Sequence, residues 1–182
     1  QLEYQAPERI RETLAAVLGQ ATNLDILELG CGTGLAAKYL KPFARHLSGI
    51  DLSPEMIEQA GTMQMYDELA VAEITAFLAS QTTGYDLILA CDTLIYFGDL
   101  AQIAQPSAAL LRPGGHLIFT VEKGEQPPFK LMDSGRYSHT EQHILAVAAA
   151  ANLEVVSIKE GFLRKEYGEP VTGLIAALRR VH

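Results

Sequence analysis

Apolar residues along the chain form two kinds of pattern, short continuous runs and repeats at three- and four-residue spacing. A short apolar run is typical of a strand covered on both faces of a parallel sheet, and the longer repeat indicates an amphipathic helix. The runs predict strands at 25–29, 46–50, 69–72, 85–90, 116–121, 153–160 and 171–178. The repeats predict helices at 7–18, 35–40, 99–111 and 140–151, and a further helix that starts after Ser53.

Proline, glycine and serine mark several element boundaries. Pro7 suits the first turn of a helix, and Gly19 ends the helical pattern that follows it. Ser53 is a favourable N-cap residue for the helix after it. Pro106 must kink or restart the helix that contains it. The "RPGG" sequence at 112–115 predicts a turn into the fifth strand.

The alternation of strands and helices predicts an α/β domain with a largely parallel, doubly wound sheet. The last two strands follow one another without a helix between them, which favours an antiparallel edge. The segment 123–139 is rich in turn-forming and polar residues, so we expect a loose insertion after the fifth strand. The 182 residues fit a single domain, with an N-terminal helix segment at 1–20.

Composition narrows the classes of partner. Hydrophobic residues make up 48% of the chain, and the formal net charge is −8, from 14 basic and 22 acidic side chains. No cluster of lysine and arginine offers a surface for tracking phosphates, which argues against a nucleic-acid partner. No apolar run reaches membrane-spanning length and no charged-then-apolar leader opens the chain, so we expect no membrane association.

The two cysteines, Cys31 and Cys91, form neither a metal-binding nor a redox motif. We therefore expect reduced thiols, a cytoplasmic location and no metal site. The chain does not begin with methionine, and we expect it to be the C-terminal part of a longer protein.

Three glycines follow the first predicted strand at alternate positions, Gly30, Gly32 and Gly34. Ligands of open α/β sheets bind beyond the carboxyl ends of the strands, and glycine lets the backbone approach them closely. The pattern Gly32-x-Gly34-x-x-Ala37 matches a dinucleotide motif, with Asp51 about where its ribose-binding acid should be. From these residues alone, a dinucleotide and a smaller adenosyl cofactor both remain open.

Acidic residues at three strand ends favour the adenosyl cofactor. Glu28 lies two residues before the glycine turn, where a carboxylate would repel a pyrophosphate and attract a cationic amino group. Asp51 ends the second strand and can accept both ribose hydroxyls. Glu73 ends the third strand and could accept from the exocyclic amine of adenine. The apolar residues expected to pack on the adenine ring are Leu52, Met56 and Ile74.

Four segments resemble successive motifs of the class I S-adenosylmethionine-dependent methyltransferases. They are "LELGCGTG", "GIDLSPEMIEQA", "YDLILACDTLIYFGDL" and "LLRPGGHLIFTVE", in family order within residues 24–122. The resemblance implies a Rossmann-like, seven-stranded sheet of order 3-2-1-4-5-7-6, with the last strand antiparallel and helices on both faces. It also implies S-adenosyl-L-methionine as cofactor, with S-adenosyl-L-homocysteine as its product.

The segments "SGRYSHT" and "FLRKEYGEPVTGLIAALRR" resemble a narrower bacterial group, in which a methyltransferase domain often follows tetratricopeptide repeats. Many class I relatives have aspartate where this chain has Glu73, so a neighbouring backbone group is an alternative partner for the adenine amine. The resemblance implies a cofactor site made of Glu28, Gly30, Cys31, Gly32, Gly34, Asp51, Leu52, Met56, Glu73, Ile74 and Cys91.

The candidate acceptor residues come from three places. Asp92 and Tyr96 follow the fourth strand, and Tyr4 could close the site from the N-terminal segment. The segment 123–139 supplies Arg136, Tyr137 and His139, which we expect over the acceptor site. Each of these six side chains has an alternative reading as a solvated or structural residue. Arg164, Lys165 and Glu166 are interpreted as a solvated approach to the last hairpin.

The acceptor itself stays open between a small-molecule oxygen or nitrogen, a carboxylate, and a side chain on a partner protein. A hydroxyl or protonated nitrogen would need a base, for which His139 is the candidate, with Tyr96 beside it. A carboxylate would instead need a cation such as Arg136. Two alternative functions are an NAD(P)-dependent oxidoreductase and a non-catalytic, cofactor-binding partner domain.

Overall fold

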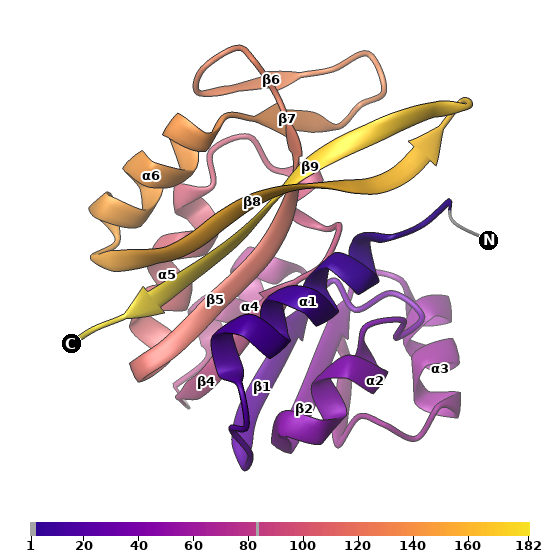
Figure 1. The fold of residues 1–182 in the computed structure, drawn as a ribbon. Coiled ribbons are helices and arrows are strands. Elements are labelled where there is room, and N and C mark those ends of the chain that lie inside the picture. Colours follow the sequence, from indigo (N-terminus) through magenta and orange to yellow (C-terminus); the bar gives the residue numbers. More distant parts are fainter. Residues whose placement is uncertain (1–2, 83) are drawn as a thin grey trace.

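A twisted β-sheet with helices on both faces organises the computed structural model, which describes residues 3–82 and 84–182 (Figure 1). The first two residues of the predicted segment 1–20 lie outside the described residues. The strands are β1 (Leu24–Leu29), β2 (Ala44–Asp51), β3 (Glu68–Val71), β4 (Tyr85–Ala90), β5 (Leu111–Lys123), β6 (Phe129–Leu131), β7 (Tyr137–His139), β8 (Leu153–Glu166) and β9 (Glu169–Arg180). The α-helices are α1 (Ala6–Leu18), α2 (Ala37–Leu40), α3 (Pro54–Thr62), α4 (Ile74–Ser80), α5 (Ala101–Leu110) and α6 (Glu141–Ala150).

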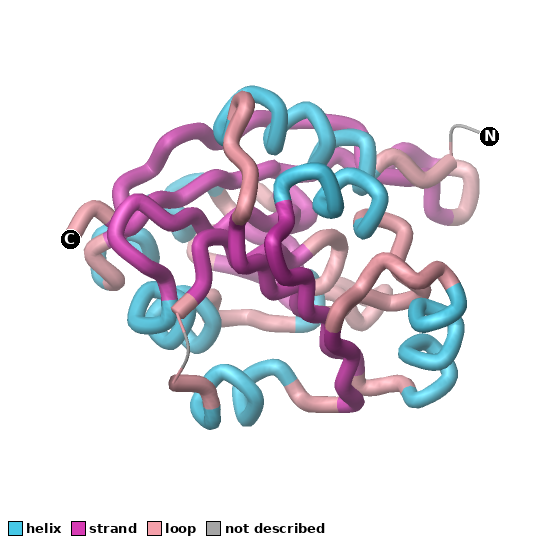
Figure 2. The backbone as a smooth tube through the Cα atoms, turned by 90° about the horizontal axis from the view of Figure 1, so that it is seen from below, coloured by secondary structure: helices cyan, strands magenta, loops and turns pink. Residues whose placement is uncertain are grey.

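The main sheet has the order β3-β2-β1-β4-β5-β9-β8. The strands from β3 to β5 are parallel to one another, and β9 runs antiparallel to both β5 and β8. This confirms the predicted order of the seven main strands and the antiparallel direction of the last one. Figure 2 shows the strands in the middle of the molecule, with helices on either side.

The chain adds two short strands to this sheet, β6 and β7, which form a hairpin within the segment 123–139. Glu122 of β5 pairs with Ser138 of β7 and with Gly173 of β9, so β7 and β9 lie on opposite sides of β5. The prediction of a loose insertion was therefore wrong. Successive side chains alternate between the two faces in Phe129–Leu131 and in Tyr137–His139. This regularity is sufficient for the two segments to pair as antiparallel strands.

Successive residues of the central strands pack on opposite faces of the sheet, as the period of two requires. Ile88 and Ala90 join a core shared with helices α4, α5 and α6. Leu87 and Leu89 join a second core shared with α1 and α2. Because both faces of β4 are covered, its sequence is apolar without alternation, and its bounds agree with the predicted 85–90.

Several predicted boundaries need correction. The helix expected at 35–40 is the single turn α2, and a 3₁₀ turn at Lys41–Phe43 continues through Pro42. Pro106 lies inside α5 without dividing it, since the helix runs from Ala101 to Leu110. The "RPGG" residues fall within β5, where the pairing with β4 shifts register. The last two strands extend further than expected and form one long hairpin.

Polar side chains define three helix starts. Ser53 Oγ accepts from the Met56 N–H at 3.2 Å, which confirms its predicted capping role for α3. Thr140 Oγ1 caps α6 by accepting from the His143 N–H at 3.2 Å. Glu73 caps α4 through its carboxylate. β2 ends just before α3, and β3 ends just before α4. The caps of these two helices therefore also fix the carboxyl ends of the two strands.

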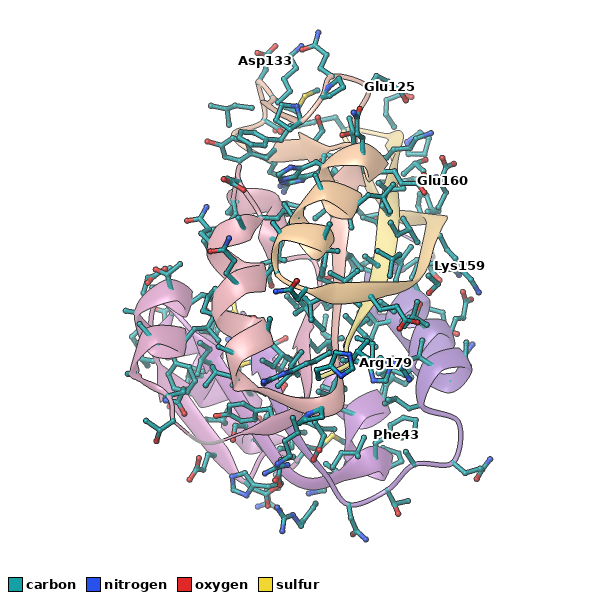
Figure 3. The ribbon with its side chains drawn as sticks, turned by 90° about the vertical axis from the view of Figure 1, so that its left-hand side faces the viewer. Phe43, Glu125, Asp133, Lys159, Glu160 and Arg179 are labelled. Atoms are coloured by element: carbon teal, nitrogen blue, oxygen red, sulfur yellow. The ribbon has the colours of Figure 1, made fainter. Side chains whose placement is uncertain are left out.

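The outer strand β8 carries exposed charges. Figure 3 shows Lys159 and Glu160 on this strand, and both side chains are exposed. Glu160 pairs with Lys123 of β5 at 2.6 Å. Charged side chains on an edge strand disfavour pairing with another chain, so this edge of the sheet is protected from aggregation.

Truncating a core side chain of β4 should destabilise the whole domain. Leu89 is 0% exposed, so Leu89→Ala removes buried methyl groups and should lower the free energy of unfolding by about 2–5 kcal/mol. The matched control, Leu131→Ala, changes a side chain that is 56% exposed and should cost less than about 1 kcal/mol. Urea unfolding followed by circular dichroism measures both, and equal losses would contradict the placement of β4 at the centre.

Candidate active site

A cavity of about 390 Å³ opens at the carboxyl edge of the sheet. Residues that follow β1, β2, β3 and β4 form most of its wall, as expected for parallel strands whose carboxyl ends share one edge. Twelve residues predicted for the site line this cavity: Tyr4, Glu28, Gly30, Cys31, Gly32, Asp51, Leu52, Glu73, Ile74, Cys91, Asp92 and Tyr96. The sequence analysis therefore identified most of the residues that form the cavity wall.

The turn after β1 has a backbone that favours glycine. Gly30 has φ 63°, and a Cβ atom there would lie 2.4 Å from the Thr93 side chain. Gly32 has φ 55° and open space where its Cβ would lie. The first glycine is thus required by packing against the loop after β4, and the second leaves the backbone open toward the cavity.

Asp51 connects the loops after β1 and β2. Its Oδ2 accepts from the Gly32 N–H at 3.0 Å, and its Oδ1 accepts from the Ser53 N–H at 2.9 Å. An ionised carboxylate offers about four lone-pair sites, so both oxygens keep capacity for a ligand. The two backbone donors hold the carboxylate at the cavity wall, where a pair of vicinal hydroxyls could donate to it.

Glu28 is a buried acid, only 2% exposed, on the floor of the cavity. Tyr66 donates its hydroxyl to Glu28 Oε1 at 2.5 Å. Burial raises the pKa of Glu28 to about 7, and the nearby Asp51 charge acts in the same direction. Burial also raises the pKa of the neighbouring Cys31 thiol to about 12. Glu28 is consequently sensitive to any cation that enters the cavity.

Glu73 lines the cavity, but its carboxylate is bound to the start of α4. Its oxygens accept from the Thr75 N–H at 3.1 Å, the Ala76 N–H at 2.7 Å and the Thr75 hydroxyl at 2.6 Å. These bonds lower the pKa of Glu73, with the Thr75 hydroxyl as the largest cause. Glu73 is therefore the N-cap residue of α4, and its contact with adenine remains a prediction.

Asp92 lines the cavity just after the end of β4. Its backbone N–H donates to Thr120 Oγ1 at 2.7 Å, and its φ is 54°. Arg164 Nη1 donates to Asp92 Oδ1 at 2.5 Å, and Arg164 Nη2 donates to Glu122. Burial raises the pKa of Asp92, while Arg164 opposes that shift.

Arg164 was wrongly interpreted as part of a solvated hairpin approach. It is 7% exposed and lies within β8, where it joins the carboxylates that follow β4 and end β5. A buried guanidinium needs paired carboxylates, because an uncompensated charge in the interior is costly. Its partners are distant in sequence, so no local spacing could have indicated this role.

The N-terminal segment supplies one wall of the cavity, as the prediction for Tyr4 required. Tyr4 forms an antiparallel bridge with Arg164, and the Gln5 N–H donates to the Leu163 carbonyl at 2.6 Å. The Lys165 N–H donates to the Glu3 carbonyl at 2.9 Å. These backbone bonds place Tyr4 at the cavity. Burial raises the pKa of Tyr4, and the nearby Cys91 and Asp92 act in the same direction.

Comparison with known proteins places the chain in a family. The family described as "Methyltransferase domain" matches residues 2–158. The chain belongs to this family. The match includes every strand end that contributes to the cavity.

Two curated relatives resemble parts of this methyltransferase domain. Nodulation protein S of Rhizobium tropici is 30% identical over 118 residues, which cover 62% of this chain and 49% of the relative. The ubiquinone biosynthesis O-methyltransferase of Xylella fastidiosa (strain 9a5c) is 34% identical over 97 residues, which cover 51% of this chain and 39% of the relative. The matched region therefore spans about half or less of these relatives.

A solved structure agrees with the fold. The magnesium protoporphyrin IX methyltransferase of Synechocystis PCC 6803, crystallised with bound S-adenosylmethionine, superposes with a TM-score of 0.71 at 17% identity. The superposition covers 96% of this chain and 78% of that structure's chain. At this identity the likeness concerns the fold.

The segment 123–139 does not bring its predicted residues into the methyltransferase cavity. Arg136 forms ion pairs with Glu166 and, at 4.0 Å, with Glu122. Tyr137 packs edge-on against Phe129, with 5.8 Å between ring centroids. The Tyr137 ring lies against Gly98 of the loop after β4. Arg136 is not among the residues that line the cavity, and its carboxylate-binding role stays a prediction.

The prediction of His139 as an accessible base is also wrong. His139 is 0% exposed, and its Nε2 lies 2.8 Å from the Phe97 carbonyl and 3.1 Å from the Gly98 carbonyl. Nε2 must carry the proton to donate to these oxygens. His139 stacks on His143, with 5.8 Å between centroids, and burial lowers the pKa of His139 to about 4. Its role is to hold the loop after β4 in place.

Two other predicted cofactor residues lie outside the set that lines the cavity. Gly34, with φ 90°, faces the Tyr66 ring, and Met56 is 41% exposed on α3. Sequence reasoning also missed Tyr66 and Thr93, which support the glycine turn. Thr93 Oγ1 donates toward the Gly30 carbonyl at 3.2 Å. Both residues lie in loops without periodic pattern, so the sequence contained no signal for them.

The buried acid Glu28 should make stability fall as pH rises. Its pKa is about 7 in the folded chain against an ordinary value of 4.5, so the unfolded chain releases the proton first. The folded state should therefore lose about 3 kcal/mol between these two pH values. In Glu28→Gln this loss should be absent. Urea unfolding of both proteins across the range measures the difference, and parallel pH profiles would contradict the burial of this acid.

The buried His139 should have the opposite effect. Its folded pKa of about 4 lies below the ordinary 6.5, so the stability it contributes is complete above pH 6.5 and is lost as pH falls toward 4. His139→Gln keeps a side-chain N–H donor for the two carbonyls without a titratable group. Thermal melts should show a steeper acid-side decrease for the wild type than for the variant. Identical acid-side slopes for the wild type and His139→Gln would indicate that His139 is exposed to solvent.

Proposed function

We propose that this methyltransferase domain transfers the methyl group of S-adenosylmethionine to an acceptor at the Asp92 end of its cavity. The observation that carries the proposal is the anchored Asp51 carboxylate, which Gly32 and Ser53 hold at the cavity wall. A carboxylate in this position suits the two ribose hydroxyls of an adenosyl cofactor. Ile74 and Leu52, which line the same cavity, suit its adenine ring.

The charge of the cavity supports an adenosyl cofactor over a dinucleotide. Among the described residues that line it are four carboxylates, from Glu28, Asp51, Glu73 and Asp92, and no lysine, arginine or histidine side chain. A pyrophosphate would be repelled by the buried Glu28 close to the glycine turn. S-adenosylmethionine instead carries cationic sulfonium and ammonium groups, which ionised Glu28 attracts.

The chemical demands on the protein are modest. Bound S-adenosylmethionine supplies an activated methyl group on its sulfonium. The chain's own residues would align the acceptor with that group and exclude water. Tyr4, Tyr96 and Phe97 line the cavity beside Asp92 and suit this purpose.

One relative supports a small-molecule acceptor, since it is named as an O-methyltransferase of ubiquinone biosynthesis. No helix within residues 3–82 and 84–182 is long and apolar enough to span a membrane. We also propose a cytoplasmic location, in keeping with the two free cysteines.

Calorimetric titration tests the cofactor assignment. S-adenosylhomocysteine and S-adenosylmethionine should bind with micromolar affinity, and NADH should give no heat. Asp51→Ala should weaken both adenosyl ligands at least tenfold, or about 1.4 kcal/mol, because the ribose hydroxyls lose their acceptor. The control, Asp133→Ala, changes an exposed acid on the β6–β7 hairpin and should leave binding unchanged.

The remaining outcomes separate the alternatives. NADH binding without the adenosyl pair would identify a dinucleotide site and overturn the proposal. Adenosyl binding that survives in Asp51→Ala would place the cofactor elsewhere in the molecule. Silence from all three ligands would favour a partner domain that does not bind the cofactor.

A further inference from the structure

The acceptor end of the cavity combines aromatic rings with a single acid. Tyr4, Tyr96 and Phe97 line it together with Asp92, and Leu35 adds an aliphatic side chain. These rings come from separate parts of the chain, the N-terminal segment and the loop after β4. Aromatic faces attract cations through their quadrupole, and an ammonium group enclosed by several rings is a recurring use of that attraction.

Asp92 belongs to an ion network that is not charge-balanced. The network contains three carboxylates, from Asp92, Glu122 and Glu166, and two guanidinium groups, from Arg136 and Arg164. With all five groups ionised, one negative charge remains. Asp92 is the member of this network that lines the cavity, so a cation bound there would meet a network with a negative balance.

The geometry also leaves Asp92 available to a ligand. Arg164 occupies Oδ1 at 2.5 Å from the side of β8, and the Asp92 N–H is held by Thr120. Tyr4 also lies beside the Asp92 carboxylate as a side-chain partner. The carboxylate is therefore fixed in direction, and its second oxygen keeps a lone pair for a group in the cavity. Burial raises the pKa of Asp92 and Arg164 opposes that shift, and an ammonium beside the carboxylate would further favour its ionised form.

From this arrangement we infer that the methyl acceptor is an amine on an apolar framework, bound as its ammonium between the aromatic side chains and Asp92. The inference rests on the proposed methyl transfer and specifies its substrate class. It is preferred to the carboxylate acceptor, for which Arg136 was the expected partner, because Arg136 is paired with acids and does not line the cavity.

The reaction balances with the groups present. The bound ammonium gives one proton to Asp92 Oδ2 and becomes a neutral amine with a free lone pair. The nitrogen then attacks the methyl carbon, so the N–C bond forms while the C–S bond breaks and its electron pair passes to sulfur. The products are an N-methylated ammonium, S-adenosylhomocysteine and protonated Asp92, which returns its proton to solvent.

Three probes of similar size and different charge test this inference. Benzylamine is a cation near neutral pH, benzyl alcohol is neutral and benzoate is an anion. Each is titrated calorimetrically into the full chain saturated with S-adenosylhomocysteine. Benzylamine should bind at least about tenfold more tightly than benzoate, with benzyl alcohol between them.

Variants separate the acid from the rings. Asp92→Asn should reduce the ratio between benzylamine and benzoate to less than about threefold, while S-adenosylhomocysteine still binds. Tyr96→Leu should weaken the binding of benzylamine by about threefold or more, because it removes an aromatic ring that attracts the cation. Tyr96 lines the cavity and is 62% exposed. Tyr167→Leu is the matched control, since Tyr167 is 97% exposed at the β8–β9 turn, and it should change nothing.

The ratio of the benzylamine affinity to the benzoate affinity in the wild type tests the amine assignment even if Asp92→Asn does not fold. Benzoate binding as tightly as benzylamine, or none of the probes binding to the loaded protein, would overturn the amine assignment. An unchanged ratio in a folded Asp92→Asn would overturn the role of Asp92. Failure of S-adenosylhomocysteine to bind would instead refute the proposed function itself, so the two failures are distinguishable.

Discussion

The burial of the central strands on both faces is the constraint on which the site depends. Helices cover β1, β4 and β5 from either side, so these strands tolerate few polar groups along their length. Polar residues are consequently concentrated where the strands end, and parallel direction brings those ends to one edge. Two acids lie within β1: Glu28 accepts a hydrogen bond from Tyr66, and Asp25 pairs with Arg45 and Arg112.

The cavity has two halves with different supports. Local backbone bonds hold the half at β1 and β2, where the Gly32 and Ser53 amides fix Asp51. The other half depends on side chains and backbone from distant parts of the chain. Arg164 joins β8 to the ends of β4 and β5, and the same residue pairs with Tyr4 through the backbone.

Local patterns in the sequence predicted the first half well. The bounds of β4, the cap at Ser53, the glycine turn and the strand order all follow from periodicity, residue type or family motif. Contacts that join residues far apart were not predicted in either half. Tyr66 reaches Glu28 of β1 across 38 positions, and Arg164 reaches Asp92 after β4 across 72. His139 and Arg136 were misplaced because the pairing of β7 with β5, which sets their direction, has no local signature.

The bridge between Tyr4 and Arg164 has a consequence for the order of folding. It joins the beginning of the described chain to its final hairpin, so the loop between them must close before the bridge can form. A ribosome delivers β1, β2 and the loop containing Asp51 long before it delivers β8. The part of the cavity at β1 and β2 has its sequence complete early in synthesis, whereas the wall at Tyr4 and Asp92 must wait for the last strands to emerge.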